Sequence, residues 1–111
     1  MVEDGIKFYI GYDRGPRGMP LTEFAPLAET LGYDGITLGG SQIGLGGGYD
    51  PFVFLSQAAA STERLLLNTS VLLLPLVHPL VLAQQVATLD NLSQGRVILG
   101  VGIGGERSVQ F

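Results

Sequence analysis

Three groups of residues in this sequence have the types and spacing to take part in chemistry. The polar run Asn68-Thr69-Ser70 interrupts an apolar stretch that begins at Leu65. Glycines at 100, 102 and 105 match the spacing G-x-G-x-x-G directly after another apolar stretch, a pattern that lets a backbone approach a pyrophosphate at a helix N-terminus. The only histidine, His78, is the residue type best suited to acid–base chemistry near neutral pH.

Each group also has a purely structural interpretation. Thr69 and Ser70 could satisfy backbone groups inside a buried strand. The glycine pattern lies after the fourth expected strand rather than in the first βα unit, and only residues 106–111 follow it, so glycines that let another segment pack close are the better interpretation. His78 precedes Pro79 at the start of an expected helix, which favours a capping or packing role.

Composition limits the function classes. Of 111 residues, 46% are hydrophobic and 14% charged, against about 25% charged in an ordinary soluble domain, so we expect an unusually large buried share. A net charge of −4 with six scattered basic residues argues against nucleic-acid binding. The chain has no cysteine, which excludes disulfides and thiolate metal sites, and we expect no metal centre.

The apolar stretch from residue 65 to 83 is not expected to cross a membrane. A spanning helix needs about 20 predominantly apolar residues, and three polar residues, a histidine and two prolines fall within this window. The N-terminus is acidic and lacks a basic region followed by a long apolar run, so we expect no secretory signal and a cytoplasmic location.

Strand and helix patterns alternate along the chain. We expect strands at 6–10, 35–38, from 65 onward, and at 96–101, with helices at 22–31, 50–62 and 78–90. Thr22 is the expected cap of the first helix, which requires Pro26 to lie in the first turn. Gly32 is expected to end that helix, and Asp50 is expected to cap the second.

This order predicts an α/β fold with right-handed crossovers and a parallel sheet. The third and fourth strands are nearly continuous apolar runs, which is typical of strands buried on both faces. Two architectures fit: an open doubly wound sheet, or the N-terminal half of a (β/α)8 TIM barrel with about four strands and three helices. A complete barrel needs about 250 residues, so residues 1–111 would form a single partial domain.

Several segments together resemble the N-terminal half of the luciferase-like flavin monooxygenase family. The segments are residues 68–75 (NTSVLLLP), 78–79 (HP), 82–90 (LAQQVATLD), 92–96 (LSQGR), 99–104 (LGVGIG), 28–35 (AETLGYDG) and 50–51 (DP). The resemblance extends from about Ile6 to Arg107 and is specific between Ser70 and Gly104.

The resemblance implies a (β/α)8 barrel that binds reduced FMN or a deazaflavin coenzyme at the carboxyl ends of its strands. In flavin members, the reduced flavin captures O2 and transfers one oxygen atom to a small organic substrate. In deazaflavin members, the coenzyme passes a hydride instead. The cofactor carries the chemistry, while the protein supplies orientation and a dry pocket. A flavin reductase is an expected partner.

The resemblance also suggests which residues meet the cofactor. Members often have a non-proline cis peptide at the end of the third strand, which here falls between Ser70 and Val71, so we expect Thr69, Ser70 and Val71 to contact the isoalloxazine. Gly102 and Gly104 would let cofactor or substrate approach. Glu106 lies near a position where many relatives carry a carboxylate, and a solvated glutamate is the alternative interpretation.

The sequence departs from the family pattern after the second strand. Many relatives have an acidic residue followed by histidine there, both facing the cofactor, whereas this chain has Gly40 and Ser41. We retain Gly40 as a cofactor contact. Without that imidazole its acid–base role is missing, and no catalytic residue is assigned.

Three functions follow. The first is a flavin-dependent oxidoreductase represented by the N-terminal half of its barrel. The second is a non-catalytic flavin-binding or structural module; because a half barrel exposes two sheet edges, it would associate with a second copy as a homodimer. The third and weakest is a small open α/β domain binding a nucleotide at Gly100 to Gly105. The substrate, and the choice between FMN and deazaflavin, are left open.

Overall fold

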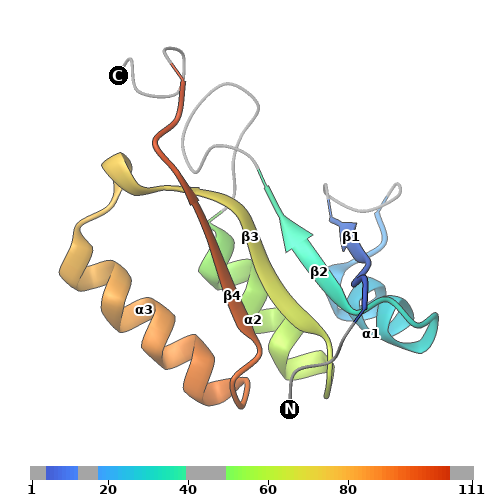
Figure 1. The fold of residues 1–111 in the computed structure, drawn as a ribbon. Coiled ribbons are helices and arrows are strands. Elements are labelled where there is room, and N and C mark those ends of the chain that lie inside the picture. Colours follow the sequence, from blue (N-terminus) through green and yellow to red (C-terminus); the bar gives the residue numbers. More distant parts are fainter. Residues whose placement is uncertain (1–4, 13–17, 40–49, 106–111) are drawn as a thin grey trace.

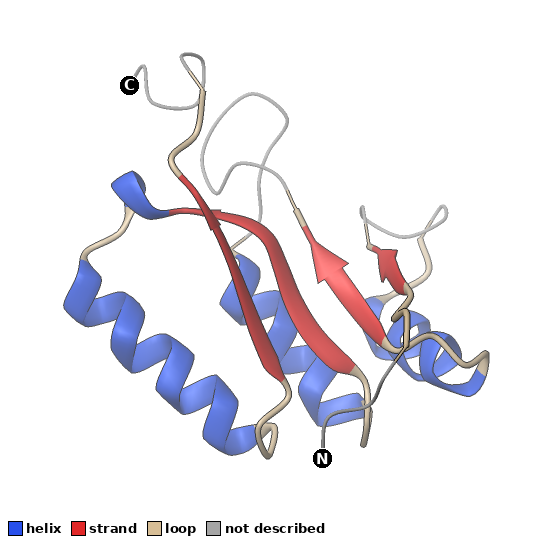
Figure 2. Cartoon of the chain, in the orientation of Figure 1, coloured by secondary structure: helices blue, strands red, loops and turns tan. Residues whose placement is uncertain are grey.

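The computed structural model describes residues 5–12, 18–39 and 50–105. Its elements are β1 (Tyr9–Gly11), α1 (Leu21–Thr30), β2 (Gly35–Leu38), α2 (Pro51–Ser61), β3 (Leu66–Leu73), a 3-10 turn (Leu74–Leu76), α3 (Pro79–Leu92) and β4 (Val97–Gly102). Figures 1 and 2 show the resulting alternation of strand and helix. No described helix is long and apolar enough to cross a membrane.

The strand order decides between the two predicted architectures. The four strands form one parallel sheet in the order β1-β2-β3-β4, and the three helices lie together on one face of it (Figure 1). A doubly wound sheet reverses its strand order and carries helices on both faces, whereas consecutive βα units with all helices outside form a barrel wall. The predicted half barrel of four strands and three helices is confirmed.

The hydrophobic core lies between the sheet and the helices. Ile36, Leu65, Leu67 and Leu72 point from the strands into this layer and are almost fully buried, as is Leu55 of α2. Each such side chain contributes roughly 1.5–3 kcal/mol relative to an exposed one. The apolar runs of the sequence therefore hold the strands against the helices.

Two predicted helix ends are confirmed. Asp50 caps α2, because its Oδ1 accepts hydrogen bonds from the backbone N–H of Phe52 at 2.9 Å and of Val53 at 3.0 Å. Gly32 follows α1 with a φ of +93°, the left-handed conformation that ends many helices with glycine.

The predicted start of α1 is wrong. The N-cap is Pro20 rather than Thr22, because the Pro20 carbonyl accepts from the backbone N–H of Glu23 and Phe24, both at 2.9 Å. Pro26 therefore lies in the second turn, not the first, and leaves one helical carbonyl without its usual donor. The signal for this start was Pro20 itself, whose extended backbone begins the helix without a side-chain cap.

The first strand is shorter than predicted. It begins at Tyr9, and Ile6 and Phe8 are exposed. The Asp34 carboxylate accepts from the Phe8 N–H at 2.8 Å, and the Phe8 carbonyl accepts from the Asp34 N–H at 2.9 Å. The Phe8 carbonyl also accepts from the N–H of Gly35, the first residue of β2, at 3.4 Å, so Phe8 is bound to the junction where β2 begins.

Burial of the fourth strand on both faces is also wrong for this chain. Ile98, Leu99 and Val101 all remain partly exposed. β4 is an edge strand here, and no described element pairs with its free side.

Glu29 ties α1 to the turn between α2 and β3. Its carboxylate accepts from the backbone N–H of Glu63 at 3.2 Å, Arg64 at 2.7 Å and Leu65 at 2.8 Å. Burial raises the pKa of Glu29, but these three hydrogen bonds and the Arg64 charge outweigh it and lower that pKa below its ordinary value. The ionised form is therefore favoured by folding.

Arg96 ties β4 to the end of α2. Its guanidinium donates to the carbonyls of Ala59 at 2.9 Å and Leu65 at 3.1 Å, and to Thr62 Oγ1 at 2.8 Å. A cation at a helix C-terminus also interacts favourably with the helix dipole. This single side chain fixes where β4 starts beside β3.

We predict that Glu29→Gln lowers the free energy of unfolding by about 1 kcal/mol at pH 7, at the low end for a charged acceptor because the carboxylate is partly exposed. The carboxylate contribution is present above the ordinary Glu pKa of about 4.3 and is lost as pH falls through the lower folded value. Urea unfolding between pH 3 and pH 7 should therefore show the two proteins converging in acid. Glu23→Gln, an exposed change on the same helix, is the control, and a pH-independent difference would contradict this role for Glu29.

Candidate functional site

The polar interruption of β3 forms a bulge near the carboxyl end of the strand. Thr69 pairs with Leu99 and Leu72 pairs with Val101, so β3 has one residue more than β4 between these two pairs. The peptide bond between Ser70 and Val71 is cis, which confirms the geometry that the family resemblance implied. The bulge lies at the same edge of the sheet as the ends of β2 and β4 (Figure 1).

Burial separates the residues of the bulge. Leu65, Leu67 and Thr69 face the helices, whereas Ser70 and Val71 are exposed, Val71 to 40%. Strand alternation puts Ser70 on the sheet face opposite the helices, which is the inner face of a barrel wall. The bulge thus presents one peptide unit to the inside of the barrel.

The side chain of Thr69 replaces the hydrogen bonds that the bulge removes. Thr69 Oγ1 donates to the Gly100 carbonyl at 2.8 Å and accepts from the Gly100 N–H at 3.0 Å. Gly100 lies between the residues that pair with Thr69 and Leu72. The cofactor contact predicted for Thr69 stays a prediction. Its hydroxyl satisfies backbone groups inside a buried strand, which is the structural role that the sequence also allowed.

Three glycines surround the bulge on the neighbouring strands. A Cβ added at Gly100 would overlap the Thr69 carbonyl oxygen, and one at Gly39 would lie 2.5 Å from the Ser70 carbonyl oxygen. At Gly102 an added Cβ would lie 2.9 Å from Val71 Cγ2. Glycine is needed at Gly39 and Gly100 because backbone packs against them, and the sequence analysis missed Gly39. A glycine at the end of a strand was the only local signal for it.

Two polar residues on the inner face were also missed. Thr37 and Asn68 are cross-strand partners of β2 and β3, and alternation places both on the face of Ser70. In the described part of the chain, Thr37 Oγ1 is the buried side-chain oxygen with no hydrogen-bond partner.

Of the remaining predicted cofactor contacts, Gly104 is described by the structure and Gly40 and Glu106 are not. Gly104 follows β4 with a φ of +79° at the same edge as the bulge. Gly40 and Glu106 lie outside the described residues, as does Ser41. The glycine pattern from 100 to 105 is not followed by a described helix, and the described strands have no reversal of order at which a dinucleotide would bind.

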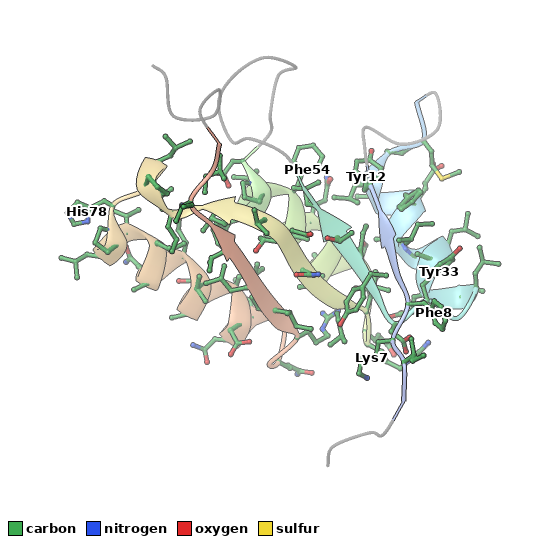
Figure 3. The ribbon with its side chains drawn as sticks, turned by 45° about the horizontal axis from the view of Figure 1, so that its top comes forward. Lys7, Phe8, Tyr12, Tyr33, Phe54 and His78 are labelled. Carbon is green, nitrogen blue, oxygen red and sulfur yellow. The ribbon has the colours of Figure 1, made fainter. Side chains whose placement is uncertain are left out.

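His78 is confirmed as a helix cap. Its Nδ1 accepts from the backbone N–H of Leu80 at 3.2 Å, and the ring is exposed at the start of α3. Figure 3 shows it at the outer end of the molecule, pointing away from the sheet.

Titratable side chains gather at the opposite edge of the sheet. Lys7, Glu29, Asp34 and Arg64 line one depression beside the amino ends of the strands, and Figure 3 places Lys7 at that end. Among the described residues no group of His, Cys, Asp or Glu could hold a metal ion. The described neighbours of Ser70 and Val71 on β2 and β4 are uncharged: glycines, backbone, and side chains such as Leu38, Leu99 and Val101.

Known proteins resemble nearly the whole chain. The family model for luciferase-like monooxygenases matches residues 11–111. An F420-dependent glucose-6-phosphate dehydrogenase of Beutenbergia cavernae is 46% identical over 89 residues, which cover 76% of this chain and 26% of that protein. The chain thus spans about a quarter of the length of this curated relative.

Solved structures share the fold. The monooxygenase RslO1 of Streptomyces bottropensis matches with a TM-score of 0.72 and 37% identity, covering 87% of this chain and 33% of that chain. The oxygenating constituent of 3,6-diketocamphane monooxygenase of Pseudomonas putida, solved in complex with FMN, matches with a TM-score of 0.77 over 91% of this chain and 30% of that chain. At 22% identity this second likeness shows the fold alone.

We predict that Gly100→Ala destabilises the chain by at least about 2 kcal/mol, because its Cβ would overlap the Thr69 carbonyl and force the two strands apart. Gly11→Ala is the matched control on the edge strand β1, since its Cβ would meet only Thr37 Cγ2 at an ordinary 3.9 Å. Chemical denaturation of both variants measures the difference. Equal stability of the two would show that β3 and β4 do not approach as closely as described.

Proposed function

Because the chain belongs to the luciferase-like monooxygenase family, we propose that it forms the cofactor-binding half of a flavin- or deazaflavin-dependent oxidoreductase barrel. The observation that carries this proposal is the exposed Ser70–Val71 peptide at the carboxyl ends of parallel strands, where barrel enzymes build their sites. The whole enzyme would oxidise a small organic substrate.

The residues of the bulge fit a flat ring system. Val71 offers an apolar surface and Ser70 a hydroxyl, and the bare strand ends at Gly39 and Gly102 add no side chain that would block the approach. Thr69 contributes its backbone, because only 1% of it is exposed. Gly104 lies at the same edge, and Gly40 and Glu106 are kept as further contacts.

The chemistry is supplied by the bound cofactor, which as reduced FMN delivers electrons to O2 and as a deazaflavin delivers a hydride. The role of this chain is to hold the ring on the inner face, with Ser70 and Val71 behind it. Thr37 Oγ1 and the Asn68 amide lie further along the same face and would hydrogen-bond a water or a polar atom of the ligand. None of these groups is charged, which suits a cofactor whose reacting ring must be kept from bulk water.

We propose either FMN or a deazaflavin as the cofactor, because similar proteins are named for enzymes of both kinds. Similar proteins include monooxygenases and F420-dependent dehydrogenases, and one structural neighbour was solved with FMN. With FMN, the activity would require O2 and a partner reductase to supply reduced flavin; with a deazaflavin, neither would be needed for hydride transfer.

We predict that the chain binds reduced or oxidised FMN, or F420, in anaerobic fluorescence titrations, and that Val71→Asp weakens this binding at least about tenfold by placing a charge against the ring. Val81→Asp is the matched control, because Val81 is also exposed but lies on α3. Oxygen consumption with NADPH, FMN and a flavin reductase, in excess of the same mixture without the chain, then distinguishes monooxygenase activity from binding alone. Absence of binding to either cofactor would contradict the proposed function.

A second candidate is a non-catalytic half-barrel module that self-associates. It is favoured by apolar side chains exposed around β4, where Leu92 is 74% and Ile103 78% exposed, and by edge strands that have no described partner on one side.

If this candidate is correct, sedimentation velocity should show a dimer at micromolar concentration. Leu92→Lys at the end of α3 and Ile103→Lys just after β4 should together shift it to monomer, because each places a charge on an exposed apolar side chain that self-association would bury. A folded monomer of the unmodified chain at the same concentration would exclude the module.

A further inference from the structure

We propose that Thr69 is a positioning residue of the cofactor site, whose hydroxyl fixes the Ser70–Val71 peptide by bridging both backbone groups of Gly100. This inference rests on the proposed function and adds to it a side chain, the Thr69 hydroxyl, that acts through its neighbours rather than by touching the ring.

The first step concerns the hydrogen bonds of the bulge. In a regular parallel pair every second residue of a strand bonds across to the neighbouring strand through its N–H and C=O. Between Thr69 and Leu72 the extra residue of β3 breaks this pattern opposite Gly100. A hydroxyl is the smallest side-chain group that both donates and accepts, and Thr69 Oγ1 does both to Gly100, at 2.8 Å and 3.0 Å. Since Thr69 is 1% exposed, water has little access to replace it.

The second step concerns space. The carbonyl of Thr69 lies over Gly100, the carbonyl of Ser70 lies over Gly39, and the Val71 side chain lies over Gly102. The bulge therefore contacts β2 on one side and β4 on the other without intervening side chains. The hydroxyl bridge acts immediately before Ser70, so a change in it is transmitted to the Ser70–Val71 unit over a single residue.

The third step distinguishes a role for the Thr69 hydroxyl in hydrogen bonding from a role for the Thr69 side chain in packing. Valine has nearly the shape of threonine but can neither donate nor accept, so Thr69→Val would leave both Gly100 groups without a partner in a buried place. Serine keeps the hydroxyl and loses a methyl group. If Thr69 served only to fill space, valine would be the better replacement; if the bridge matters, serine would be.

The test measures FMN and F420 affinity by fluorescence, the visible circular dichroism of bound FMN, and amide exchange at Gly100 by NMR. We expect Thr69→Val to lose about tenfold in affinity, the equivalent of one or two net hydrogen bonds, to change the dichroism, and to exchange the Gly100 amide faster than wild type. We expect Thr69→Ser to stay within about threefold of wild type with unchanged dichroism. Thr88→Val, which removes a hydroxyl that bonds only within α3 at 2.7 Å, should match wild type.

The outcomes distinguish the two proposals. Failure of the wild-type chain to bind either cofactor overturns the proposed function, and the inference falls with it. Normal wild-type binding that Thr69→Val leaves unchanged overturns the inference alone. Should Thr69→Val not fold, Thr69→Ala and Thr69→Ser replace it as a pair of similar size that differs in the hydroxyl, and equal affinity of that pair overturns the inference.

Discussion

The need to pair buried backbone groups governs this fold more than any single hydrophobic contact does. An unpaired N–H or carbonyl in a buried place is costly, and a parallel sheet with short connections creates such groups at each irregularity. Three side chains meet this need. Glu29 accepts from the turn before β3, Arg96 donates to the end of α2, and Thr69 serves Gly100 at the bulge. The first two fix the amino-terminal edge of the sheet, and the third fixes the edge that carries the candidate site.

The two edges of the sheet are stabilised in different ways, and this difference allows an irregular peptide at the carboxyl edge of an otherwise regular sheet. At the amino-terminal edge, charged groups make bonds to backbone and lock helices to strands. At the carboxyl edge, Gly39 and Gly100 allow backbone to lie against backbone, and Gly102 makes room for the Val71 side chain. A bulge is tolerated there because its lost hydrogen bonds are replaced by one hydroxyl and its volume is accommodated by missing side chains. The exposed Ser70–Val71 peptide therefore depends on glycines beside it on both sides: Gly39 after β2, and Gly100 and Gly102 of β4.

Local patterns predicted what depends on local physics. The Asp50 cap, the Gly32 end and β2 follow from periodicity and turn chemistry within a few residues. The alternation of strands and helices predicted a parallel sheet but fitted a doubly wound sheet as well as a half barrel, and the barrel was implied by the family resemblance. The cis bond came from family resemblance, since no composition or spacing rule indicates it. The cap at Thr22 failed because Pro20 begins the helix without a side chain. The bonds of Thr69 and the space at Gly39 could not be predicted, because both depend on register between strands about 30 residues apart in sequence.

The distribution of charge also limits what this part of the barrel can do in catalysis. A proton-transfer group must lie within hydrogen-bond reach of the reacting atoms. Among the described titratable residues of the carboxyl edge, Asp50 and His78 already serve as helix caps. The Tyr12 hydroxyl donates to the Met19 carbonyl at 3.0 Å, and Glu23 is exposed in the first turn of α1. The other charged groups lie mostly at the far edge. Under the proposed function, the described strands would orient the cofactor through neutral polar contacts, and none of their described residues is assigned as an acid or base for a substrate.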